Sequence, residues 1–175
     1  MVVEPADSGR SVGAMSQHLA SLPYVDEHAV TIEANRDVSW VALQHMLESA
    51  APAWFSRVLG CIDTAASGPR PMEEGSTVPG FRVVAADAPH ELSLAGRHHF
   101  SDYALIFRLD ELSEGRTRLR AESRAVFLGF RGGPYRMLLM GTGGHVLATR
   151  RMLAAVKRAA ERFIADADGE GAEAS

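Results

Sequence analysis

PYRMLLMGTGGHVLATRRMLAAVKRAAERFI, residues 134–164, is the stretch that decides the fold. Apolar or small residues recur in it at steps of three or four: Leu139, Thr142, Val146, Thr149, Leu153, Val156, Ala160 and Phe163. This spacing predicts an α-helix with one buried face. The opposite side of the wheel carries charges and predicts a face in water: Arg150, Lys157, Arg158, Glu161 and Arg162. At about 1.5 Å per residue the helix would exceed roughly 40 Å, so it needs a large apolar surface to cover.

Residues 80–127 supply such a surface, because they read as repeated strands. Segments 81–86 and 91–97 flank the turn-like sequence Asp87-Ala88-Pro89-His90, which predicts a hairpin. Two further strands are expected over 99–110 and 116–127, with Glu114 and Gly115 at the turn between them. The last strand alternates most clearly, with one apolar or small face: Thr117, Leu119, Ala121, Ser123, Ala125 and Phe127. We therefore expect an antiparallel meander with one buried face and one face in water.

The N-terminal half predicts a strand followed by helices. Residues 25–34 alternate with a period of two, which predicts the first strand. Asp37 is expected to cap a helix that ends near Glu48, with Val41 on its buried face. A second short helix is expected from Pro52 to Gly60. The segment 61–79 is rich in Gly and Pro and predicts mostly loop, with a short strand near 75–78.

The predicted domain organisation is a single domain over residues 24–165. Residues 1–23 mix Gly, Ser, Ala and Pro without a sustained period, which predicts a flexible lead. Residues 166–175 are small and acidic, which predicts a disordered tail. A chain of 175 residues with 46% hydrophobic content is long enough for one real core and short for two.

Composition narrows the partners and the compartment. The net charge of -4 gives no global field that favours nucleic acid or an anionic membrane. The single cysteine, Cys61, excludes an intrachain disulfide framework and fits the cytoplasm. No window approaches the roughly 18 apolar residues of a membrane span, and no export signal is recognisable, so we expect no membrane insertion. Monomer and homodimer both remain open.

The order of strand, two short helices, antiparallel meander and long C-terminal helix resembles the helix-grip fold of the START-like, or Bet v 1-like, superfamily (SRPBCC). Residues 32–43, IEANRDVSWVAL, resemble the first strand and capped helix of its polyketide cyclase and lipid-transport members. Residues 103–109 with 115–119 resemble its strands, and 135–161 its last helix. The resemblance implies an α+β class, in which a curved antiparallel sheet wraps around the long helix. Its motifs are structural, and the superfamily shares no catalytic set.

The resemblance also implies binding of a hydrophobic small molecule, lipid- or polyketide-like, in a cavity between the sheet and the C-terminal helix. Small residues on the inward strand face and the glycines at 141, 143 and 144 would leave space. The alternative is close packing of helix on sheet without a cavity. The residues expected to line the site are Ser101, Tyr103, Leu105, Phe107, Leu119, Ala121, Ser123, Phe127, Thr142, His145 and Thr149.

An enzyme of the cyclase or dehydratase kind, using the same cavity, is the main alternative. His145, Tyr103 and Arg131 are the candidates for proton transfer, and His145 is the best because histidine titrates near neutrality. No carboxylate partner for His145 is identifiable in the sequence, and an acid-partnered His145 would favour the enzyme. A protein-interaction module without a ligand is a third hypothesis.

Other motifs predict no further chemistry. His98 and His99 are neighbours on a strand and point to opposite faces, so we expect no metal site and no cofactor. The glycines at 129, 132 and 133 match no phosphate-binding loop. The arginines of the last strand are expected on its outer face, in water or paired with acids of the next strand, which gives no support to nucleic-acid binding.

Overall fold

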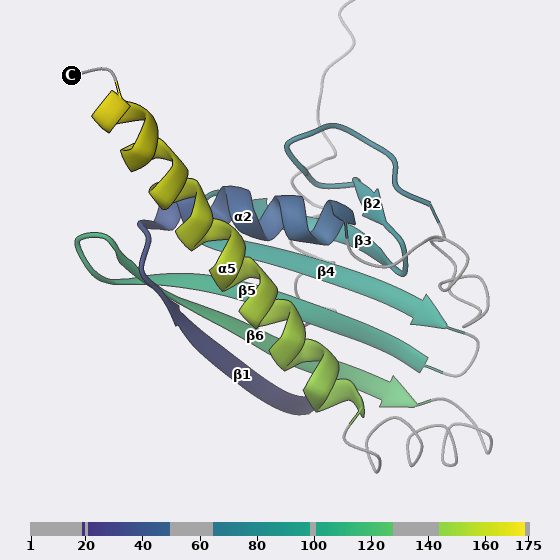
Figure 1. Cartoon of the computed structure of the whole chain (residues 1–175). Coiled ribbons are helices and arrows are strands. Elements are labelled where there is room, and N and C mark those ends of the chain that lie inside the picture. Colours follow the sequence, from purple (N-terminus) through teal and green to yellow (C-terminus); the bar gives the residue numbers. More distant parts are fainter. Residues whose placement is uncertain (1–18, 20, 50–64, 99–100, 128–143, 174–175) are drawn as a thin grey trace, which may run out of the picture.

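The computed structural model describes residues 19, 21–49, 65–98, 101–127 and 144–173. Their helices and strands are, in chain order, β1 (Tyr24–Ile32), α2 (Arg36–Ser49), β2 (Thr77–Val78), β3 (Phe81–Asp87), β4 (Glu91–His98), β5 (Ser101–Ser113), β6 (Arg116–Phe127) and α5 (Gly144–Glu173). The strands form one antiparallel sheet in the order β1-β6-β5-β4-β3-β2. Figure 1 shows the sheet curving behind α5, with α2 on the same side of it. The predicted α+β helix-grip architecture is confirmed.

The pairing of β6 with its two neighbours sets which side chains face the helices. Phe107 of β5, Ala121 of β6 and His28 of β1 lie side by side across the three strands. Since side chains alternate along a strand, the residues two positions away share this inner face. The β5–β6 turn contains Gly115 at φ +72°, a backbone conformation that glycine adopts without strain. The strands expected within 81–127 are therefore confirmed over the described residues; positions 99 and 100 lie outside them.

The main core lies between the inner face, α2 and α5. Its fully buried members come from strands and both helices: Ile32, Ala42, Leu43, Leu92, Leu94, Phe107, Leu119, Ala121, Val156 and Ala160. Burying a Leu, Val, Ile or Phe side chain contributes roughly 1.5 to 3 kcal/mol. This cluster thus holds both helices on one face of the sheet.

Helix α2 begins two residues earlier than predicted and uses a different cap. The Val38 N–H donates to Asn35 Oδ1 at 2.9 Å, so Asn35 caps the helix in place of Asp37. Val41, predicted to face the core, is 57% exposed, while Leu43 and Leu47 are buried. The prediction was wrong because the moderate apolar periodicity of this helix fits more than one face.

Most of the buried stripe predicted for α5 is confirmed, but part of the face predicted to lie in water is wrong. Thr149, Leu153, Val156 and Ala160 are buried. Lys157, placed in water by the wheel, donates from Nζ to the Thr31 carbonyl oxygen at 2.8 Å and pairs with Glu161. Glu161 Oε1 in turn accepts the Glu33 N–H at 3.2 Å. Long side chains on the flank of a helix reach a neighbouring strand that a wheel does not show. Leu139 and Thr142 lie outside the described residues.

The C-terminal end of the helix was also predicted wrongly. The backbone stays helical to Glu173, beyond Ile164 and into the segment expected to be disordered. Alanine and glutamate favour helix, and the single glycines at 169 and 171 weaken it without stopping it. The predicted helix over 52–60 lies outside the described residues.

The end of the N-terminal segment packs against the sheet. Leu19 and Leu22 are buried on the outer face of the sheet, in a cluster with Val84 and Ala104. The Ala125 N–H donates to the Pro23 carbonyl oxygen at 3.0 Å. The part of the predicted flexible lead that the structure describes is therefore packed. Two leucines in a polar segment are too few to form a hydrophobic pattern that the sequence alone would reveal.

Candidate functional site

Four polar side chains meet on the inner face of the sheet, beside the first turn of α5. Asp26 and His28 come from β1, Ser123 from β6 and His145 from α5. His145 Nε2 lies 3.0 Å from Ser123 Oγ and 3.4 Å from Asp26 Oδ1. His28 Nε2 lies 3.2 Å from the other carboxylate oxygen, Asp26 Oδ2. We call these four residues the His–Asp cluster.

The backbone explains why the cluster forms. Asp26 and His28 are two positions apart on β1, so their side chains share the face that also carries Val30 and Ile32. Asp26 pairs in register with Ser123 on β6. His145 is the second residue of α5, and its carbonyl oxygen accepts from Thr149 Oγ1, one turn later, at 3.0 Å. Strand register and helix placement together assemble the cluster.

The His–Asp cluster is only partly enclosed. Its ionisable side chains keep 15% exposure at His28, 22% at Asp26 and 23% at His145, while Ser123 is buried. A carboxylate shared by two imidazoles can orient both rings, and an oriented imidazole can accept or donate a proton near neutral pH. The arrangement can therefore bind a polar group of a ligand or transfer a proton to it.

Asp26 is the functional candidate that sequence reasoning missed. The sequence offered no identifiable acid for His145, and the structure places one 3.4 Å away. One signal was available in the sequence. The Asp26 carboxylate falls on the same alternating face as His28, Val30 and Ile32, and this face of the first strand was expected to be buried. A charged residue on such a face is uncommon unless it is paired or functional.

Tyr103 lies farther along the inner face and has a structural role. Its hydroxyl donates to the Gly80 carbonyl oxygen at 2.8 Å, and its ring packs edge-on against Phe81. Gly96 lies directly opposite on β4, where a Cβ atom would come within 2.1 Å of the Tyr103 ring. The tyrosine ring therefore requires glycine at position 96.

The remaining predicted site residues fall into three groups. Leu105, Phe107, Leu119 and Ala121 are members of the main core. Ser101 is buried and pairs in register with the half-buried Phe127 at the same end of the sheet. Thr142 and Arg131 lie outside the described residues. Of the predicted set, the structure thus brings together Ser123, His145 and Thr149, and fills the centre of the face with packed side chains.

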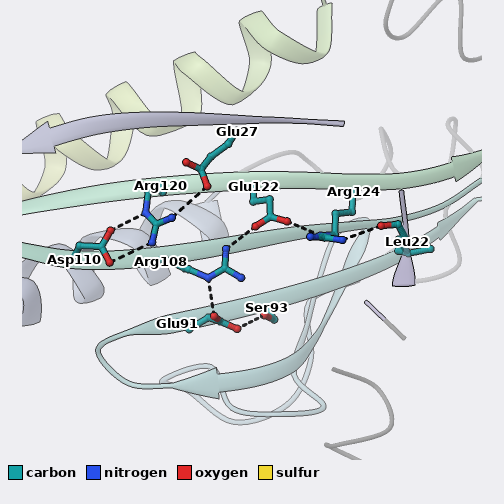
Figure 2. A network of polar contacts seen from close by, with 9 residues as sticks. All are labelled: Leu22, Glu27, Glu91, Ser93, Arg108, Asp110, Arg120, Glu122 and Arg124. Atoms are coloured by element: carbon teal, nitrogen blue, oxygen red, sulfur yellow. Dashed lines mark hydrogen bonds and ion pairs between the residues drawn. The ribbon is translucent and has the colours of Figure 1, made fainter. Parts of the chain in front are cut away.

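The outer face of the sheet carries a network of ion pairs, shown in Figure 2. Arg120 binds Asp110 at 2.7 Å and Glu27 at 3.4 Å. Arg108 bridges Glu91 at 3.0 Å and Glu122 at 2.6 Å, as Figure 2 shows. The predicted pairing of outer-face arginines with acids on neighbouring strands is confirmed for Arg120, whose acids lie on β5 and β1.

Glu122 stands at the centre of this network. Its second oxygen binds Arg124, which also donates to the Leu22 carbonyl oxygen at 3.0 Å. Burial raises the pKa of the Glu122 carboxyl, but hydrogen bonds and charge from Arg108 and Arg124 outweigh it, so the pKa is below its usual range. Glu122 thus holds β5, β6 and the N-terminal segment together as an anion.

Within the described ranges, no group of three or more His, Cys, Asp or Glu side chains is placed to hold a metal ion. None of the helices in those ranges is long and apolar enough to cross a membrane.

Comparisons with known proteins support the fold. No family model matches the chain, and no curated protein sequence matches it significantly. Among solved structures, the Zhui aromatase/cyclase from Streptomyces sp. R1128 is similar at a TM-score of 0.55 and 17% identity, over 82% of this chain and 96% of that chain.

Two other solved structures have lower scores. A conserved protein from Geobacillus kaustophilus has a TM-score of 0.49 and 12% identity, over 78% of this chain and 94% of its own. CalU16 from Micromonospora echinospora has a TM-score of 0.44 and 16% identity, over 83% of this chain and 94% of its own. Together with the six-stranded antiparallel sheet closed by a long C-terminal helix, the similarity to the Zhui protein shows that this chain has an α+β helix-grip fold.

Proposed function

We propose that the protein binds a hydrophobic small molecule, lipid- or polyketide-like, in a cavity between the inner face of the sheet and α5. The observation that carries the proposal is the partly exposed His–Asp cluster beside an otherwise apolar face. Small-molecule sites combine mainly apolar walls with a few convergent polar groups that orient the ligand. The cluster supplies such groups.

The packing of the core favours one end of the face for the ligand. Ala121 and its neighbours are fully buried, so the centre has no exposed surface to offer. Four residues farther along β6, Ala125 is half-buried and pairs in register with the half-buried Tyr103. The proposed cavity therefore lies toward Ala125 and the start of α5, and not over Ala121.

An enzyme of the cyclase or dehydratase kind is the second candidate, favoured by the Asp26 partner of His145. An imidazole oriented by a carboxylate is the arrangement that general acid–base catalysis uses, and such catalysis contributes roughly 10²- to 10⁴-fold in rate. The Zhui protein, similar in fold, is an aromatase/cyclase. The same cavity would then position the reacting chain.

Native mass spectrometry of freshly purified protein tests the proposal by detecting a retained apolar compound. Titration with the uncharged fluorescent probe Nile red adds a measured affinity. Ala125→Trp should weaken Nile red binding while the fold survives, and Arg118→Ala, at an exposed outer-face position, should not. Absence of both a retained compound and saturable Nile red binding would contradict the proposal.

Chemical change separates the binder from the enzyme. A retained compound is returned to fresh protein and to His145→Phe protein, and recovered after incubation. A binder returns it unchanged in both, whereas an enzyme converts it only with His145 present.

We further propose a cytoplasmic location, in keeping with the single Cys61.

A further inference from the structure

Asp26 presents one carboxylate oxygen to each of two imidazole rings. Oδ2 faces His28 Nε2 at 3.2 Å, and Oδ1 faces His145 Nε2 at 3.4 Å. In both rings the nitrogen turned toward the carboxylate is Nε2. This shared geometry bears on where the hydrogens of the His–Asp cluster lie.

An ionised carboxylate only accepts hydrogen bonds, so a ring nitrogen that bonds to it must carry a hydrogen. A neutral imidazole has a single N–H, and Nδ1 is then a bare acceptor. Ser123 Oγ lies 3.0 Å from the same Nε2 of His145 and can accept its hydrogen or donate to it, so the assignment rests first on His28, whose Nε2 contacts the carboxylate. In the part of the chain that the structure describes, neither Nδ1 has a hydrogen-bond partner.

Resting on the proposed function, we propose that the His–Asp cluster selects apolar ligands whose polar end is a hydroxyl group, an alcohol or a phenol. The hydroxyl hydrogen would be donated to Nδ1 of His145 or His28. Where the Nε2 hydrogens bond to Asp26, the Nδ1 nitrogens can only accept a hydrogen bond from the ligand.

Other polar ends are disfavoured for physical reasons. An ether or a ketone only accepts, so it would leave Nδ1 unpaired when the ligand displaces water, and an unpaired buried polar group costs affinity. A carboxylate would meet the negative charge of Asp26. The selection for hydroxyl-bearing ligands thus follows from the carboxylate, and Asp26 is its positioning residue.

A matched ligand pair tests the inference. 1-Naphthol and 1-methoxynaphthalene share the same apolar rings, but only the first can donate a hydrogen bond. At pH 7.5, wild-type protein should bind 1-naphthol roughly three- to tenfold more tightly, the range expected of one neutral hydrogen bond. Displacement of Nile red supplies both affinities.

Variants assign the preference to the cluster. Asp26→Asn places an amide donor beside the rings and turns one imidazole to its other tautomer, so the preference should fall toward parity. His28→Phe with His145→Phe should abolish it, while His45→Phe, at an exposed position of α2, should retain it. Melting curves confirm that each variant is folded. The ¹⁵N NMR shifts of the imidazoles report the tautomers directly, even in a variant with altered stability.

The outcomes separate the inference from the function on which it rests. If Nile red binds but the naphthalene pair binds equally or not at all, the inference is overturned and the proposed function stands. If His28 and His145 carry their hydrogens on Nδ1, it is overturned as well. If Nile red and both naphthalenes fail to bind, the proposed function fails and the inference fails with it.

Discussion

His145 Nε2 lies 3.4 Å from Asp26 Oδ1 although 119 positions separate the two residues. This contact ties the first turn of α5 to the beginning of β1. Lys157, three turns later, binds the carbonyl oxygen of Thr31 at the end of the same strand. Helix α5 is therefore anchored to β1 at two polar points, with the apolar Leu153 and Val156 between them. A change at either point should alter how the helix sits on the sheet.

Placing aspartate on the buried and on the exposed side of α5 should have unequal effects on the free energy of unfolding. Leu153 is 2% exposed and belongs to the main core, so Leu153→Asp should cost several kcal/mol, roughly 4 or more, or prevent folding. Arg158→Asp, on the exposed side of the same helix, should change the free energy of unfolding by about 0.5 kcal/mol or less. Urea denaturation measures both, and similar losses would mean that the helix face is assigned wrongly.

The N-terminal segment should contribute to stability through Leu22. Because its side chain is buried against the outer face, Leu22→Ala should lower the free energy of unfolding by about 2 kcal/mol or more. Tyr24→Ala removes a larger side chain that is exposed, and should cost much less. Thermal melting of the two variants compares them, and equal shifts would argue that Leu22 is not packed.

Acid should destabilise the protein through Glu122. Its pKa is lower in the folded state than in the unfolded chain, so its contribution is complete above the unfolded pKa of about 4.5 and is lost as the pH falls through the folded pKa. Glu122→Gln should be less stable near neutrality and lose less on acidification below about pH 4.5. Glu114→Gln, at the exposed β5–β6 turn, is the control. Parallel stability profiles for wild type and Glu122→Gln would rule out this role.

The position of the proposed cavity predicts different results for the same substitution at two sites on β6. Ala121→Trp overfills a packed core and should cost roughly 1 to 3 kcal/mol or more. Ala125→Trp, at a half-buried position, should cost less and should weaken Nile red binding. Fluorescence titration and melting curves measure both effects. Tolerance of tryptophan at Ala121 would instead place open space at the centre of the face.

Local pattern was enough to predict the sheet and the long helix. In β6 every second residue faces the core, so Leu119 and Ala121 alternate with Arg118 and Arg120 and the period is visible in sequence. The stripe on α5 is equally regular from Thr149 to Ala160. Where one buried face spans many residues, the hydrophobic period determines the element.

The His–Asp cluster could not be predicted in the same way. Its contacts join β1, β6 and α5, and depend on strand register and on where the helix crosses the sheet. His145 was recognisable as a titratable residue near the helix stripe, but Asp26 gained its role only when the pairing with Ser123 was known. Leu22 was missed for a related reason, because its partners Val84 and Ala104 lie on distant strands.

NMR of the histidine rings during titration with Nile red tests the central claim most directly, because it reports binding and location together. We expect saturable shifts of the His28 and His145 imidazole signals, with no change at His90 in the exposed β3–β4 turn. Saturable binding that leaves His28 and His145 unshifted, or no binding at all, would contradict a hydrophobic-ligand site at the His–Asp cluster.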